Sequence, residues 1–174
     1  MNAQSWLSGE HTAILDGEAR ILLPVGLRNL LNPMREEVTM MASLEPEGCV
    51  RIRRVEQWSA YVEELRAQAS QSLRHRRVMM LVAATSAQVK IDKQGRLRIP
   101  DSMMAKAKIE RPTDKSDKSE VVIVGHFDDL CLWASEQWSN FCESAMADFG
   151  TDLEWLHCGD ASRVDHSVPE DPAA

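Results

Sequence analysis

Apolar residues occupy every second position on both sides of a short polar break near the middle of the chain. They flank Lys90 in VKI, residues 89–91, and they recur in LRI, residues 97–99. This alternation predicts two strands of a hairpin with one apolar face. Asp92 can bond the backbone of the turn, and Gly95 can adopt the positive φ that a tight connection requires. Pro100 then ends the second strand and begins a short helix.

The same arrangement occurs earlier in the chain. DGEARILLP at 16–24 and DKQGRLRIP at 92–100 share Asp, Arg and Pro at one spacing, 76 positions apart. Glu-Gln-Trp recurs at 56–58 and 136–138, 80 positions apart, and we place the four extra residues in the polar stretch 111–120. In each half, two more short strands and an amphipathic helix follow the hairpin. The chain therefore contains two copies of one pattern.

These copies predict an α+β fold. A hairpin or a four-stranded unit buries too little surface to be stable alone, so the halves should fold onto one another as one pseudo-twofold β unit with peripheral helices. The expected boundaries are 7–57 for the first repeat, 58–86 for a helical connector, 87–137 for the second repeat, 138–149 for a C-terminal helix and 150–174 for an acidic, mobile tail.

Composition and the absence of known motifs indicate a globular cytoplasmic protein that is not an enzyme. With 174 residues, 44% of them apolar, the chain can bury a core. It has no apolar run long enough to cross a membrane and no secretory signal, which predicts a cytoplasmic protein. Its cysteines, at 49, 131, 142 and 158, form no CxxC pair and have no histidine at metal-ligand spacing, so we expect free thiols. We find no catalytic motif, metal site, cofactor site or small-molecule site, and predict that the protein is not an enzyme.

Charge is distributed unevenly along the chain. The net charge is −7, which by itself argues against a nucleic-acid partner. Residues 1–73 carry 7 basic and 10 acidic side chains, residues 74–118 carry 12 and 5, and residues 119–174 carry 1 and 12. The middle segment is thus +7 and contains the second hairpin, which keeps DNA possible as a partner.

The doubled Asp-x-x-x-Arg hairpin, each copy with Pro four positions after the Arg, resembles the MraZ family of bacterial regulators built from two SpoVT/AbrB-type repeats. The resemblance spans residues 7 to about 149 and is best in DKQGRLRIP and the following VVIVGHF. It implies a swapped-hairpin β fold and assembly of the protein with itself into closed rings. It also implies sequence-specific repression through double-stranded DNA repeats in the promoter of the division and cell-wall gene cluster, and a place at the nucleoid.

The resemblance carries functional residues onto this chain. Asp16 and Arg20 match the first motif and Asp92 and Arg96 the second, but Glu18-Ala19 stands where the family usually has Lys-Gly. An acidic side chain there repels phosphate. The candidate DNA-binding residues are Arg96, Lys93, Arg98 and Lys90 in the second hairpin, Arg20 in the first, and Arg74, Arg76 and Arg77 in the connector. The candidate turn residues are Asp16, Asp92, Gly95, Pro24 and Pro100.

Each of these assignments has an alternative. The second hairpin could be a solvated strand face whose Asp-Arg pair only braces the turn, and the three connector arginines could be a solvated helix surface. The first hairpin, with Ile14 and Leu22 where the second has Lys90 and Arg98, could pack against a neighbouring subunit. Whole-protein alternatives are a ring-forming or partner-binding scaffold without specific DNA recognition, and an antitoxin whose acidic tail covers a toxin.

Overall fold

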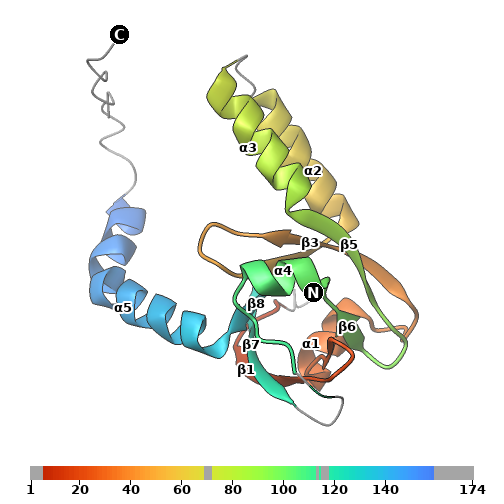
Figure 1. Cartoon of the computed structure of the whole chain (residues 1–174). Coiled ribbons are helices and arrows are strands. Elements are labelled where there is room, and N and C mark those ends of the chain that lie inside the picture. The colour runs from red at the N-terminus through yellow and green to blue at the C-terminus, as the bar shows by residue number, and fades with distance from the viewer. Residues whose placement is uncertain (1–5, 69–71, 113, 115–117, 159–174) are drawn as a thin grey trace, which may run out of the picture. The chain divides into compact units, whose positions relative to one another are not determined.

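The computed structural model describes residues 6–68, 72–112, 114 and 118–158. Eight antiparallel strands close into a barrel in the order β1-β2-β6-β5-β3-β4-β8-β7 (Figure 1). The first half supplies β1 (Glu10–Leu15), β2 (Arg20–Leu22), β3 (Val38–Leu44) and β4 (Val50–Arg54). The second supplies β5 (Ser86–Ile91), β6 (Arg96–Arg98), β7 (Ser119–His126) and β8 (Asp129–Ala134).

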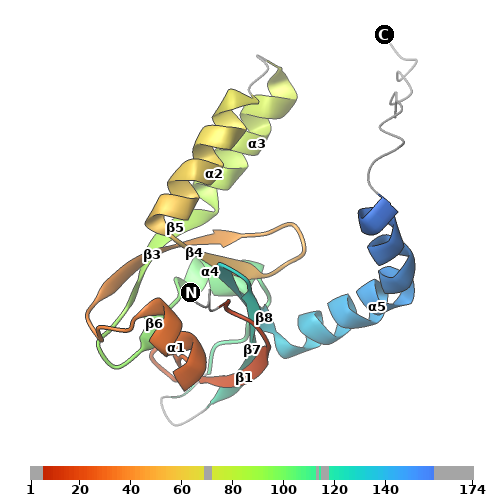
Figure 2. The ribbon, with the colours of Figure 1, turned by 180° about the vertical axis from the view of Figure 1, so that it is seen from behind.

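Helices occupy equivalent places in the two halves. The short helices α1 (Val25–Leu31) and α4 (Asp101–Lys106) follow the first hairpin of each half, with Pro24 and Pro100 as their N-caps. After β4 come α2 (Val55–Ala67) and α3 (Leu73–Ala84), and after β8 comes α5 (Ser135–Cys158). Figures 1 and 2 both show α2 and α3 lying side by side. The chain divides into two compact units at Ser139, so most of α5 belongs to the second unit.

Strand pairing reveals an internal twofold relation between the halves. Exchanging β1–β4 with β5–β8 leaves the barrel order unchanged. The β2·β6 ladder is centred on Ile21 and Leu97, and the β4·β8 ladder on Arg51 and Cys131. Each centre pairs one residue with its equivalent, so the pseudo-twofold axis passes through both ladders. This confirms the expected α+β class and pseudo-twofold arrangement; the swapped-hairpin assignment stays a prediction.

The core is built jointly by the two halves. Leu15, Ile21 and Leu23 from the first hairpin are buried together with their counterparts Ile91, Leu97 and Ile99. A fully buried side chain of this kind contributes about 1.5–3 kcal/mol relative to an exposed one. Because the two halves supply the residues of one buried cluster, neither half has a complete core of its own.

The helical segments differ from the sequence expectation in two places. Two helices fill the connector, and Ser72 caps the second by accepting a hydrogen bond from the His75 N–H (3.2 Å). Helix α5 continues to Cys158, beyond the expected end at residue 149. Of the predicted tail, residues 159–174 lie outside the described residues. No helix among those described is long and apolar enough to span a membrane.

Candidate nucleic-acid interface

The outward face of the β2·β6 ladder gathers three arginines at the pseudo-twofold axis. Arg20 stands opposite Arg98, and Leu22 opposite Arg96. Side chains alternate across a strand, so the pairing that buries Ile21 and Leu97 turns these four residues outward. Directly opposed side chains lie roughly 4.5–5.5 Å apart at Cβ, and like charges at that distance are destabilising. Such a face favours an anionic partner.

The two turns beside this face are closed in the same way. The Asp92 carboxylate accepts hydrogen bonds from the N–H groups of Gln94 (2.8 Å) and Arg96 (2.9 Å). Asp16 accepts the equivalent bonds from Glu18 and Arg20, both at 2.9 Å. Each carboxylate thus bonds two backbone N–H groups of its own turn.

The arginine that follows each turn differs in its partners. Arg20 Nε donates to Asp16 (3.0 Å), and its Nη1 lies 2.7 Å from Glu18 Oε2. Among the described residues, no ion pair involves Arg96, Arg98 or Lys93. Gln94 occupies the position of Glu18 in the second half. The first hairpin thus neutralises its own arginine, whereas the second keeps its cations available.

The pKa values of the first pair reflect this contact. Desolvation alone would raise the pKa of Asp16, but hydrogen bonds from the Arg20 backbone and side chain and from the Glu18 N–H outweigh it and lower the pKa. The hydrogen bond to Asp16 in turn raises the pKa of Arg20. Both groups stay charged and satisfy each other.

Helix α1 of the first half braces the turn of the second hairpin. Gly95 has a φ of 80°, and a Cβ placed there would lie 2.0 Å from Arg28 Cδ. Arg28 Nη1 donates to the Gln94 carbonyl oxygen (3.1 Å). Buried Asn32 donates to the carbonyl oxygens of Glu36 (2.7 Å) and, over a longer distance, Asp92 (3.4 Å). Sequence reasoning missed Arg28 and Asn32, because nothing in the chain marks contacts over such separations.

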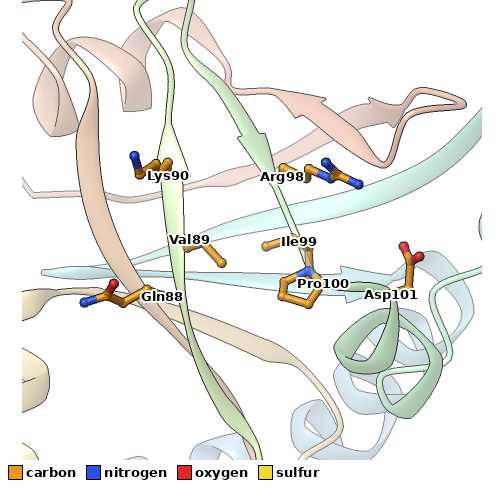
Figure 3. Close-up of a pocket in the computed structure, with 7 residues that line it drawn as sticks. All are labelled: Gln88, Val89, Lys90, Arg98, Ile99, Pro100 and Asp101. Atoms are coloured by element: carbon orange, nitrogen blue, oxygen red, sulfur yellow. The ribbon is translucent and has the colours of Figure 1, made fainter.

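A shallow pocket of about 520 Å³ adjoins the arginine face. Figure 3 shows Lys90 on β5 and Arg98 on β6 at its edge, with Asp101 at the start of α4. The Lys90 ammonium pairs with Glu37, and Asp101 pairs with Arg111 (2.8 Å). Both pairs are exposed, so each contributes little stability and can yield to a stronger anion. Lys90 is thus partly compensated and Arg98 is the stronger anion-binding group.

The remaining candidate cations divide between this face and the helical connector. Lys93 is exposed in the turn beside Arg96. Arg74, Arg76 and Arg77 are exposed on α3, which runs away from the barrel beside α2 (Figures 1 and 2). The structure therefore brings together Arg20, Arg96, Arg98, Lys93 and Lys90 but not the three connector arginines.

The opposite end of the axis holds a buried ionic cluster rather than an open surface. Arg51 bonds Asp129 (2.9 Å), and Arg53 bonds Glu45 (3.0 Å) and Ser43 (2.7 Å). These side chains tie the β3–β4 turn to β8. All four charged groups are mostly buried and paired, so we read the cluster as structural.

The cysteines and tryptophans also take structural places. Cys49 and Cys131 are buried thiols, Cys142 is partly buried, and the side chain of Cys158 lies outside the described part. A hydrogen bond with Cys131, followed by burial, raises the pKa of the Cys49 thiol. The ring of Trp58 lies tilted against Tyr61 and that of Trp138 against Trp133, with ring centroids 5.7 and 5.4 Å apart. This agrees with the packing role expected for Trp58 and Trp138. Among the described residues, no cluster of side chains could hold a metal ion.

Comparison with known proteins finds similarity to one family. Residues 80–154 match the family described as "MraZ protein, putative antitoxin-like". A transcriptional regulator MraZ from Carboxydothermus hydrogenoformans is 27% identical over 139 residues, 80% of this chain and 88% of that protein. The one from Lactobacillus helveticus is 28% identical over 141 residues, 81% of this chain and 90% of that protein. Both comparisons therefore find this chain similar to MraZ proteins.

The match covers both halves of the barrel, and it confirms the resemblance seen in the two hairpins. The relative from Limosilactobacillus reuteri is aligned over 87% of this chain and 97% of its own length, at 24% identity. MraZ proteins are named as transcriptional regulators, which confirms the prediction that this protein is not an enzyme.

Proposed function

We propose that this protein is a transcriptional regulator that binds double-stranded DNA through the outward face of β2 and β6. The observation that carries the proposal is the pair Arg96 and Arg98, which are exposed next to Arg20 and have no carboxylate partner among the described residues. A guanidinium in this position can bond guanine or phosphate through two parallel donors. Lys93 and Lys90 add charge beside it.

The full proposal is that the protein represses transcription as a closed ring of its own copies, each built from two swapped-hairpin repeats of the AbrB type. The target is a set of repeated boxes in the promoter of the division and cell-wall gene cluster, and the protein acts in the cytoplasm at the nucleoid. A single module is a weak binder on a chain of net charge −7. Several modules tethered at the spacing of the boxes gain affinity without any new contact.

One observation supports a second function. Ile14 and Leu22 are 42% and 55% exposed on the outer side of the first hairpin, and Arg20 is neutralised by Asp16 and Glu18. Such a hairpin suits contact with protein better than contact with phosphate. The alternative is a ring-forming scaffold that keeps the fold without specific DNA recognition.

A salt-dependent titration with a matched pair of variants separates the two functions. The probe is duplex DNA from upstream of the protein's own gene, with an unrelated duplex as comparison. We expect Arg96→Ala to lose about 1–3 kcal/mol of binding free energy, because it removes an available guanidinium. Arg20→Ala is the control at the equivalent position, and should lose less because Arg20 is already paired.

The salt dependence gives the second readout. Affinity of the unmodified protein should fall steeply with salt, with a slope of about −0.9 per phosphate contacted. Equal, weak binding to both duplexes, with Arg96→Ala indistinguishable from the unmodified protein, would favour the scaffold.

A further inference from the structure

Helices α2 and α3 form an apolar groove that the rest of the barrel unit leaves open. A hollow of about 450 Å³ is lined by Trp58 and Tyr61 of α2, by Val78, Leu81 and Val82 of α3, and by the β3–β4 turn. A second hollow shares Val78 with the first and extends along α3 to Arg74. Val78 and Leu81 are 43% and 63% exposed. The groove therefore runs along most of the length of α3.

Helix α5 carries an apolar stripe of matching form. Met146, Phe149, Leu153 and Leu156 follow one another at steps of three, four and three residues, which places them on one face of a helix. All four are exposed in the single chain, with Met146 at 68% and Leu156 at 66%. A continuous apolar stripe of this size on a soluble protein marks a site of contact with another surface.

The charges around the two features are complementary. Between residues 140 and 158 the chain has no Lys or Arg, and Glu143, Asp148, Asp152 and Glu154 flank the stripe on both sides. Helix α3 has no acidic residue. Its Arg74 lines the second hollow, and helical spacing places Arg77 one turn before Leu81 on the side of the groove. The same helical spacing places Arg76 on the side of α3 that faces away from the groove. Opposite charges at the rim favour one register and one partner.

The lengths agree as well. At about 1.5 Å per residue, the stripe from Met146 to Leu156 is roughly 15 Å long. The groove side of α3, from Arg74 to Thr85, is about 16 Å long by the same rise. One helix laid on two with apolar positions at steps of three and four gives the packing of a coiled-coil bundle.

We propose that α5 of one copy of this protein lies in the α2–α3 groove of a second copy. The two surfaces are different, so the contact is head-to-tail and repeats from copy to copy until the ring closes. The proposal rests on the self-assembly part of the proposed function and is independent of DNA binding. It also gives Arg74 and Arg77 the task of holding acidic side chains of a neighbour.

Charge reversal tests the contact on the full-length protein without DNA. One variant reverses the groove rim, Arg74→Glu with Arg77→Glu, and the other reverses the helix, Asp152→Arg with Glu154→Arg. Each alone should raise the protein concentration at which the oligomer dissociates by about tenfold or more, as measured by sedimentation equilibrium. Mixed one to one, the two variants should assemble again, because each reversed groove then meets a reversed helix.

Arg76→Glu is the control, since it makes the same kind of change on the far side of α3 and should leave assembly unchanged. Circular dichroism and the thermal midpoint confirm that each variant is folded. An unchanged oligomer in both reversed variants overturns this contact but leaves a ring through another surface. Failure of the mixture to reassemble also overturns it. A wild-type protein that stays monomeric overturns the contact and the ring together, while DNA binding is judged separately by the titration with Arg96→Ala.

Discussion

Gly95 shows how one residue couples the turn to the rest of the molecule. Its positive φ is costly for any residue with a Cβ, and the Arg28 side chain fills the space that a Cβ would need. In the first half, Ala19 adopts a φ of 60° at the equivalent position and is fully buried. The backbone conformation alone thus tolerates alanine; the added constraint in the second half is the arginine from α1.

We therefore predict that Gly95→Ala destabilises the protein by about 1–3 kcal/mol, from positive φ and displacement of Arg28. Urea denaturation measures this. Gly26→Ala is the control, because Gly26 lies in α1 with nothing within 4 Å of its Cβ position. That change should be neutral or stabilising by up to about 1 kcal/mol. Equal losses in the two variants would mean that Arg28 does not hold the turn.

At the scale of elements, the sequence predicts the strands and turns that a local pattern of residues determines. Alternation around residues 16–24 and 92–100 correctly predicted both hairpins, and the repeat predicted their twofold relation. The ladders refine the insertion: Val38 and Ser119 are equivalent and 81 positions apart, whereas Arg51 and Cys131 are 80 apart. The second half has therefore gained five residues before β7 and lost one in the β7–β8 turn. The sequence spacing revealed only the net gain of four residues.

Contacts between distant segments could not be predicted in this way. The bond from Arg28 to Gln94 joins residues 66 positions apart, and the ionic cluster joins Arg51 to Asp129 across 78. No spacing or local composition in the sequence marks the residues of either contact. The contrast between Arg20 and Arg96 was partly visible, because Glu18 replaces a residue that is basic in the family, but the bond from Arg20 to Glu18 needed the structure.

This contrast between the hairpins gives a prediction at the same scale. Glu18→Gln copies the second hairpin, where Gln94 holds that position, and removes one of the two carboxylates on Arg20. We expect tighter DNA binding, and a salt slope steeper by up to about 0.9 if Arg20 then contacts a phosphate. Glu63→Gln on α2 changes the net charge equally and should leave the slope unchanged. An effect of equal size in both variants would mean that the change in net charge, and not the release of Arg20, causes the tighter binding.

At the scale of the whole molecule, charge opposes DNA binding while the local face favours it. The chain carries −7 overall, and the cations of the β2·β6 face are few. Long-range repulsion from the acidic segments is screened over about 8 Å at physiological salt, whereas direct contacts are screened much less. A single copy should therefore bind one box weakly, and useful affinity has to come from several copies held together.

The last prediction follows from that requirement. We expect the unmodified protein to bind a duplex with two boxes at least about 100-fold more tightly than a duplex with one, since tethering makes the second contact intramolecular. In the variant Arg74→Glu with Arg77→Glu, this ratio should fall towards one while affinity for a single box stays the same. Inserting about five base pairs between the boxes should also lower the ratio in the unmodified protein, because it turns the second box to the other side of the duplex. Fluorescence anisotropy on the two duplexes measures both affinities. If the variant instead loses affinity for the single box, Arg74 and Arg77 contact phosphate themselves, as the charge pattern of the sequence first indicated.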